Sequence, residues 1–367
     1  MPKITGTSHD DRLSGNPFED TILGRAGNDL LLGNLADDVL HGEEGDDTLL
    51  GEEGDDQIYG ENGDDLIIGG SGHDRLFGQW GDDRVIGGDG NDLLQGGPGR
   101  NSLWGDAGDD RIDGNGANDV IHPGAGTNFV RAGSGHDRIE MPRLQEPDRI
   151  DIMTLLAGDE NDTAWGGSGA DNLRGETGSD SLQGAWGDDR LDGGAGNDQL
   201  YGGEGADRLL GGDGDDVLHA GHNESAAKQS VLTAGAGTDT FDFSFHYVDS
   251  WLIDDGFFLL YKVSHLISDF TAGEDKLHIA GRVDRQIEGP DGRYRFDFAA
   301  LDTNKDGVLT RTDDAISSDF ASFMGDRQPS LTIDIGKFDA LKQASAFEFS
   351  GTITLYGVAA LTAADFA

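Results

Sequence analysis

The sequence predicts an all-β protein built from short repeated turns and strands, followed by a smaller C-terminal region that lacks the repeat. Three observations lead to this prediction: a period of nine residues, 60 glycines in a chain of 367 residues, and a hydrophobic fraction of only 35%. A chain this poor in apolar residues buries little core for its length. Something besides apolar burial must therefore stabilise it.

The nonapeptides occur in two unbroken blocks. Residues 6–140 divide into fifteen units and residues 157–219 into seven, and one further unit spans residues 234–242. A clear example is GEEGDDTLL at residues 42–50. Position six of the unit is Asp except at Asn101 and Asn128, and position eight is apolar throughout. Such a regular period indicates a stack of identical turn-and-strand units.

A single unit cannot stabilise itself through its core. A turn followed by a strand of three residues buries one apolar side chain, which contributes about 2 kcal/mol, whereas ordering each backbone residue costs about 1–2 kcal/mol. The chain has no cysteine, so neither disulfides nor thiolate metal sites are available. Glycines that free the loop carbonyls, together with the carboxylate at position six, predict oxygen-ligated calcium instead.

The unit GGxGxDxUx resembles the RTX, or haemolysin-type, calcium-binding repeat of secreted bacterial toxins and metalloproteases. This resemblance covers residues 6–242 and implies a right-handed parallel β-roll, with two nonapeptides per coil and calcium between loops on the same side. The expected carboxylate ligands at position six are Asp29, Asp38, Asp47, Asp56, Asp65, Asp74, Asp83, Asp92, Asp110, Asp119, Asp137, Asp171, Asp180, Asp189, Asp198, Asp207 and Asp216.

The charge of the chain supports a cationic partner. There are 71 acidic and 26 basic residues, a net charge of −45, which excludes binding to nucleic acid or to an anionic membrane surface. An ion needs two loops on the same side of the roll, so a block of n units offers at most n − 2 sites. The blocks of fifteen and seven units therefore offer at most eighteen calcium sites. We expect fewer, and we expect the first two units to cap the roll. The units in doubt depart from the consensus at His9, Phe18, Ala36, Asn101, Ala117, Asn128 and Glu160.

The repeats and their interruptions suggest six segments. These are a first roll block (1–140), an irregular connection (141–156), a second block (157–242), an aromatic-rich capping region (243–300), an EF-hand-like loop (301–315) and a C-terminal cap (316–367). Pro142 and Pro147 predict a kink or loop in the connection that divides the roll. The alternative is one continuous roll with a bulge.

One outward-facing row is apolar. Position nine points away from the core, and every second unit lies on the same sheet, which stacks Leu32, Leu50, Ile68, Ile86 and Trp104 into a stripe. The stripe is either a surface that docks the C-terminal region or a protein partner, or simply a row of residues with high strand propensity.

The C-terminal region carries two further signals. Residues 267–277 resemble the stretch that follows the roll in serralysin-type domains, and residues 352–367 resemble the ends of proteins exported by type I secretion machinery, which implies a secreted, extracellular protein. Residues 302–313 match a twelve-residue EF-hand loop. Its expected calcium ligands are Asp302, Asn304, Asp306, Val308, Thr310 and Asp313.

No catalytic motif is found. HExxH and GxSxG are absent, and paired carboxylates such as Asp46–Asp47 are interpreted as one ligand beside one solvated neighbour. The N-terminus has no apolar segment typical of a signal peptide, and no apolar run is long enough to span a membrane. We therefore expect a secreted, non-catalytic calcium-binding protein with an adhesive, matrix-forming or calcium-sequestering role. The alternative is a non-catalytic module that works with a secreted protease or polysaccharide-modifying enzyme.

Overall fold

The computed structural model describes residues 3–141, 151–221 and 230–247, and beyond them the segments 261–267, 276–283, 293–295, 308–309, 316–323, 326–334, 349–356 and 361–362. Strands are the regular elements of these residues, and none of them belongs to a helix that could cross a membrane. The chain forms two compact units, Met1–Leu182 and Gln183–Ala367.

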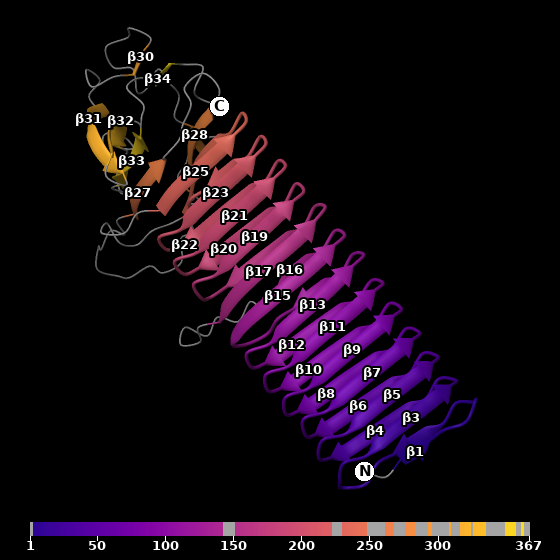
Figure 1. Cartoon of the computed structure of the whole chain (residues 1–367). Helices are drawn as coiled ribbons and strands as arrows, with labels where there is room; N and C mark the ends of the chain where they lie inside the picture. Colours follow the sequence, from indigo (N-terminus) through magenta and orange to yellow (C-terminus); the bar gives the residue numbers. More distant parts are fainter. Residues whose placement is uncertain are drawn as a thin grey trace. The chain divides into compact units, whose positions relative to one another are not determined.

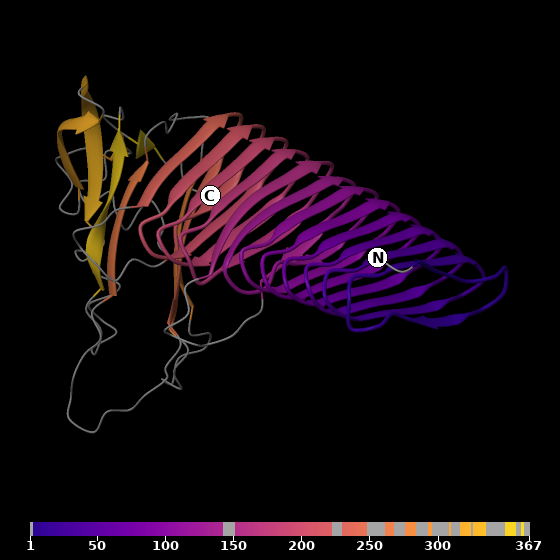
Figure 2. The ribbon, with the colours of Figure 1, turned by 60° about the horizontal axis from the view of Figure 1, so that its bottom comes forward.

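The first unit consists of two parallel sheets whose strands alternate along the chain (Figures 1 and 2). One sheet contains β1 (Lys3–Thr5), β3 (Thr21–Ala26), β5 (Val39–Glu44), β7 (Gln57–Asn62), β9 (Arg75–Trp80), β11 (Leu93–Pro98), β13 (Arg111–Gly116), β15 (Thr127–Ser134), β17 (Ile152–Asp159) and β19 (Asn172–Thr177). The other contains β2 (Arg12–Ser14), β4 (Leu30–Leu35), β6 (Thr48–Glu53), β8 (Leu66–Ser71), β10 (Arg84–Asp89), β12 (Ser102–Ala107), β14 (Val120–His122), β16 (Arg138–Glu140) and β18 (Thr163–Gly167).

The register of these strands follows the sequence period. Leu31 pairs with Leu49 and Leu40 pairs with Ile58, so equivalent residues lie 18 positions apart and two nonapeptides complete one coil. The pairing is parallel at every step of the ladder from β1 through the odd-numbered strands to β19. The predicted parallel β-roll is therefore confirmed.

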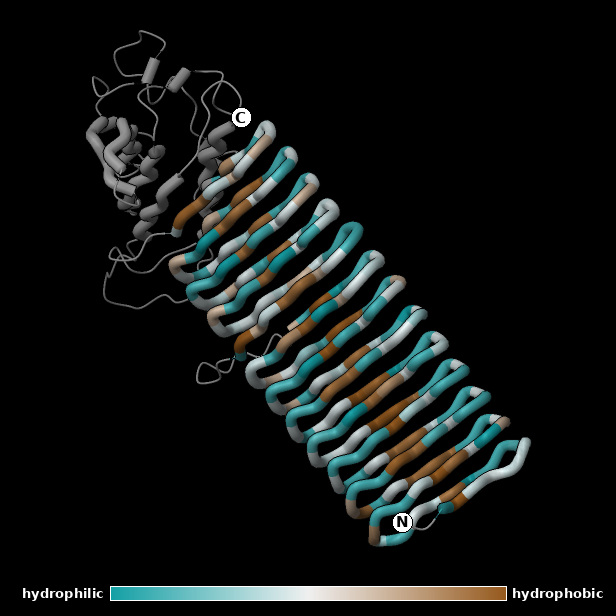
Figure 3. Tube along the Cα trace, viewed as in Figure 1, coloured by the Kyte–Doolittle hydropathy of each residue, from teal (hydrophilic) through white to brown (hydrophobic). Residues whose placement is uncertain are grey.

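The core is a double row of position-eight side chains. Twelve successive residues of this kind are fully buried, and hydrophobic segments form bands across neighbouring strands (Figure 3). They are Ile22, Leu31, Leu40, Leu49, Ile58, Ile67, Leu76, Val85, Leu94, Leu103, Ile112 and Ile121. Most strands contain six residues rather than the expected three, because pairing continues past the position-one glycine to position three of the next unit.

The connection between the two repeat blocks lies within paired strands. β15 pairs with β17 and β16 pairs with β18, both in parallel, so the ladder passes the connection on both sheets. The register step widens there from 18 to 25 residues, as between Val130 and Leu155. Of the two alternatives, this pairing agrees with a continuous roll. Residues 142–150 lie outside the described residues.

β20 (Ser181–Trp186) spans the boundary between the units, and the second unit begins with the same architecture. Parallel pairing links β21 (Arg190–Ala195), β23 (Arg208–Asp213), β25 (Ser230–Ala236), β27 (Tyr261–Ile267) and β33 (Phe349–Tyr356) in one sheet, and β22 (Gln199–Glu204), β24 (Val217–His219), β26 (Thr240–Tyr247) and β28 (Lys276–Val283) in the other.

The final strands of the second unit pair in antiparallel fashion. They are β29 (Arg293–Arg295) on β28, β32 (Asp326–Asp334) on β33, β31 (Ile316–Phe323) on β32, and β30 (Val308–Leu309) with β34 (Leu361–Thr362). Parallel pairing thus extends past residue 242 before the strand direction reverses. The division of the C-terminal region into segments stays a prediction.

Candidate metal centre

All seventeen carboxylates predicted at position six are buried. Their exposed fraction ranges from 0% at Asp56 to 3% at Asp29, although each stands in a loop next to solvent. Position five behaves differently, since Asp46 is exposed whereas Asp47 is buried. The structure therefore places the two carboxylates of each pair in different environments, as the sequence indicated.

One oxygen of each buried carboxylate is held by the neighbouring coil. The backbone N–H of Asp29 donates to Oδ1 of Asp47 at 2.7 Å, and that of Asp47 donates to Oδ1 of Asp65 at 2.8 Å. Asp65 continues the row by donating to Asp83 at 2.9 Å. These bonds fix each side chain in one rotamer. The other oxygen of each carboxylate, Oδ2, therefore points the same way within its loop.

In the described part of the chain, fourteen position-six aspartates have an Oδ2 atom without a hydrogen-bond partner. They are Asp29, Asp38, Asp47, Asp56, Asp65, Asp74, Asp83, Asp92, Asp110, Asp119, Asp137, Asp162, Asp207 and Asp216. Burying an ionised oxygen without a hydrogen-bond partner destabilises the fold by roughly several kcal/mol. A regular row of such oxygens repeats that cost in every coil. A cation beside each oxygen would offset it.

In twelve of these units a position-one glycine keeps the space in front of Oδ2 open, whereas the units of Asp137 and Asp162 begin with Ala132 and Ala157. A Cβ added to Gly60 would collide with Oδ2 of Asp65 and lie 2.9 Å from the carbonyl oxygen of Gly78 in the next coil. A Cβ on Gly42 would meet Asp47 in the same way and lie 2.6 Å from the carbonyl oxygen of Gly60. A carboxylate and a carbonyl from the next coil thus face one small space, which is the donor chemistry that calcium prefers.

Among the described residues, no three His, Cys, Asp or Glu side chains converge on one point. Main-chain carbonyls must therefore complete any coordination shell. This explains why the unit needs glycines, which let the backbone approach an ion, as well as aspartate.

Burial raises the pKa of these carboxyl groups. The pKa of Asp38 rises to about 6, that of Asp65 to about 7 and that of Asp119 to about 8, in each case chiefly through desolvation, with a further rise from neighbouring carboxylates. In the absence of metal, the folded rows would bind protons near neutral pH. Protons and calcium therefore compete for the same oxygens.

Calcium affinity should fall on acidification. Below a pKa of about 6–8 the ion must displace a proton from each carboxyl group, so affinity should drop about tenfold per pH unit at a site that releases one proton. Calcium titrations at about pH 8 and about pH 5.5 would measure this. An affinity that is the same at both pH values would contradict the assignment of these carboxylates as ligands.

The first two units satisfy their own carboxylates. Oδ2 of Asp11 accepts a hydrogen bond from Oγ1 of Thr7 at 2.9 Å, and Oδ2 of Asp20 accepts from the backbone N–H of Asn16 at 2.6 Å and from Nδ2 of Asn16 at 2.7 Å. These loops need no cation, which fits their expected role as a cap.

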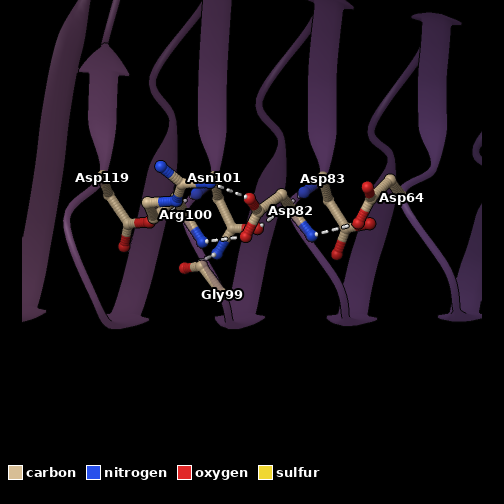
Figure 4. A network of polar contacts seen from close by, with 7 residues as sticks. All are labelled: Asp64, Asp82, Asp83, Gly99, Arg100, Asn101 and Asp119. Carbon is tan, nitrogen blue, oxygen red and sulfur yellow. Dashed lines mark hydrogen bonds and ion pairs between the residues drawn. The ribbon is translucent and has the colours of Figure 1, made fainter.

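Asn101 and Asn128 replace the cation with an amide. Nδ2 of Asn101 donates to the carbonyl oxygen of Gly97 at 3.1 Å. It also donates to the carbonyl oxygen of Gly99 at 3.0 Å, while Oδ1 of Asn101 accepts the N–H of Asp83 (Figure 4). Nδ2 of Asn128 donates to the carbonyl oxygen of Gly124 at 3.3 Å. The Oδ1 ladder thus continues, but the loop carbonyls are already satisfied by the protein.

Arg100 places a positive charge at the surface of the same loop. Its guanidinium contacts Oδ2 of Asp82 at 2.7 Å on the exposed position-five row (Figure 4). Of the two asparagine loops, the one at Asn101 is therefore the better neutralised without metal.

Three departures at position four leave the loop intact. Ala36, Ala117 and Glu160 adopt φ values of 75°, 67° and 71°, the left-handed conformation that glycine would supply. Asp162 is not among the predicted ligands, and Glu160 places its unit among those in doubt. Yet Asp162 is 1% exposed, its Oδ2 has no partner, and burial raises its pKa to about 8. Its place at position six of the unit is the sequence signal that could have identified it.

The EF-hand-like loop falls almost entirely outside the described residues. Val308 begins β30, which pairs with β34. Asp302, Asn304, Asp306, Thr310 and Asp313 lie outside the described residues, so their role as ligands stays a prediction.

Comparison with known families supports this geometry. The model of the RTX calcium-binding nonapeptide repeat (4 copies) matches residues 5–140 and 154–218 in overlapping segments, which is more than half of the chain. The chain belongs to the RTX calcium-binding repeat family. It is accordingly a calcium-binding repeat protein that takes multiple calcium ions.

Among solved structures, the chain is similar to a hyperactive, Ca²⁺-dependent, β-helical antifreeze protein from an Antarctic bacterium. The two share 20% sequence identity over 77% of this chain and 82% of that chain, with a TM-score of 0.31. No curated protein matches the chain.

Proposed function

We propose that this RTX protein is a secreted, non-catalytic calcium-binding protein whose folding is driven by extracellular calcium. The observation that carries the proposal is the row of buried Oδ2 atoms without a hydrogen-bond partner, twelve of which lie beside a position-one glycine and a carbonyl from the next coil. Its downstream role is adhesion, matrix formation or calcium sequestration.

The physical basis is the difference in calcium between the two sides of the membrane. At low cytosolic calcium, the stacked carboxylates repel one another and the small core cannot compensate, so the chain stays unfolded for export. External calcium then neutralises the rows and allows the coils to form. We assign export to the type I secretion machinery, with residues 352–367 as the address.

A calcium titration followed by far-UV circular dichroism tests the proposal, with magnesium as the control ion. We expect a cooperative gain of β signal specific to calcium, with a midpoint of about 10⁻⁴–10⁻³ M, as in extracellular calcium modules. Magnesium should act weakly because it keeps its waters and demands a tighter octahedral shell. A chain that is fully folded in chelator would refute the proposal.

The stripe of Leu32, Leu50, Ile68, Ile86 and Trp104 is formed as a continuous row. Successive members are register partners on β4, β6, β8, β10 and β12, and each is half-buried. We assign it a role in protein contact, since a contiguous apolar row on a strongly acidic surface favours association.

Ile68→Asp should weaken association of the calcium-loaded chain, because it places a charge in the middle of the stripe. Light scattering coupled to size-exclusion chromatography, together with thermal unfolding, would measure this. Leu23→Asp is the matched control, since Leu23 holds the same repeat position on the other sheet, between Thr5 and His41. If Ile68→Asp changed neither association nor stability, the contact role would be wrong.

A further inference from the structure

A cavity of about 330 Å³ opens on the first unit, on the sheet opposite the apolar stripe. Its walls come from three successive strands, β9, β11 and β13. They include the apolar side chains of Phe77, Trp80 and Pro98 and the amides of Gln79, Gln95 and Asn115. This volume is at the lower end of the range for small-molecule sites, about 300–1,000 Å³.

The cavity arises where a glycine interrupts a row of long side chains. Gln79, Gly97 and Asn115 occupy position two of successive coils, and Gly97 leaves a gap between its two neighbours. Gly97 has a φ of 105°, and a Cβ there would meet the carbonyl carbon of Gln79 at 2.9 Å. The backbone itself therefore maintains the hollow.

An aromatic stack fixes one wall. The rings of His41, Tyr59 and Phe77 stack in sequence, with centroid separations of 4.8 and 5.0 Å and interplanar angles of 10° and 7°. The row of rings ends at Phe77, whose next register partner is Gln95. The second wall is formed by Trp80, a large aromatic side chain that is 63% exposed. Both rings are presented without an aromatic partner on the cavity side.

The lining carries no charge, although the chain has a net charge of −45. On the two preceding coils, the position-two residues are Glu43 and Glu61, which are register partners of each other, and Glu61 is followed in that row by Gln79. The acidic row therefore gives way to amides at the cavity. Without a carboxylate the site is unsuited to calcium, and the surrounding negative field disfavours an acidic ligand.

We propose that this cavity binds a neutral saccharide. A sugar ring presents C–H groups that pack on the faces of Trp80 and Phe77, and hydroxyl groups that both donate to and accept from planar amides. Gln79, Gln95 and Asn115 supply both kinds of hydrogen-bonding group without charge. The inference deepens the proposed function, on which it rests for the calcium-folded state, because it names the ligand class of an adhesive or matrix role.

The test uses the full chain in saturating calcium. Cellohexaose, laminarihexaose and chitohexaose are titrated as neutral probes, with a hyaluronan oligomer as the acidic probe, and binding is followed by calorimetry and tryptophan fluorescence. We expect at least one neutral probe to bind and the acidic probe not to bind. Trp80→Ala should weaken that binding about tenfold or more, the effect of losing one aromatic contact, and Gln95→Leu should also weaken it.

Trp186→Ala is the matched control, because Trp186 is an exposed tryptophan at the same repeat position, outside the cavity. It should leave binding unchanged. Circular dichroism of the same samples reports separately on calcium-driven folding. A calcium-folded chain that binds none of the neutral probes would overturn this inference and leave the proposed function intact. Equal binding by Trp80→Ala, or binding of an aromatic peptide in place of every sugar, would also overturn it.

Discussion

Replacing Gly60 with alanine is expected to remove at least one calcium ion from the roll and to destabilise it by about 1–3 kcal/mol, the usual cost of overpacking a tight site. The new methyl group would occupy the space that Oδ2 of Asp65 and the carbonyl oxygen of Gly78 face. Gly60 does not adopt a left-handed φ, so alanine is compatible with its backbone and the effect isolates the lost space. Bound calcium is counted by native mass spectrometry, and stability is measured by thermal unfolding in calcium.

Gly116→Ala is the control for this experiment. A Cβ on Gly116 would meet only Oγ of Ser134 at 3.4 Å, an ordinary contact. We expect an unchanged ion count and a stability within about 0.5 kcal/mol of the wild type. Equal ion counts for Gly60→Ala and the wild type would show that the ion does not occupy the space in front of Gly60.

Replacing Asn101 with aspartate should produce the opposite change, a gain of one calcium ion. The new carboxylate would face the carbonyl oxygens of Gly97 and Gly99, which now accept hydrogen bonds from Nδ2. Without calcium, those oxygens would repel one another, so the variant should be less stable than wild type in chelator by about 1–3 kcal/mol, the cost of leaving buried polar groups unpaired. In saturating calcium this difference should largely disappear.

Asn91→Asp controls for the added charge. Asn91 is exposed at position five, and its Oδ1 accepts the N–H of Asp109 at 2.9 Å, a bond that aspartate preserves. It should change neither the ion count nor the calcium dependence. If Asn91→Asp and Asn101→Asp behaved alike, the amide of Asn101 would not be a substitute for the metal.

Much of the fold follows from the sequence period. A repeat of nine with Asp at position six and an apolar residue at position eight predicts which side chain is buried and that equivalent residues lie 18 apart, as Leu31 and Leu49 do. The length of the strands could not be predicted in this way. It depends on pairing between positions one to three of neighbouring coils, which a single unit does not reveal.

The details of the site are less accessible to sequence. Nothing in one repeat indicates that the Oδ1 atom of Asp65 would accept the N–H of Asp47 and leave Oδ2 alone. Glu160 at position four places its loop in doubt, yet its backbone adopts the left-handed conformation, and Asp162 in that loop is buried like the other position-six aspartates. The uncharged cavity lies between outward-facing residues that are 18 positions apart in the sequence, such as Gln79 and Gly97. The apolar pattern that predicts the stripe around Ile68 is on the other sheet and does not reveal the cavity.

Anomalous diffraction from crystals grown in calcium would show whether calcium ions lie beside the buried Oδ2 atoms, because it locates each ion. We expect peaks about 2.3–2.6 Å from Oδ2 of residues such as Asp47 and Asp65, and no peak in the loop where Asn101 donates to Gly97 and Gly99. Peaks on the exposed position-five row, beside Asp46 and Asp64, with none at Asp47 and Asp65, would contradict this placement of the ions.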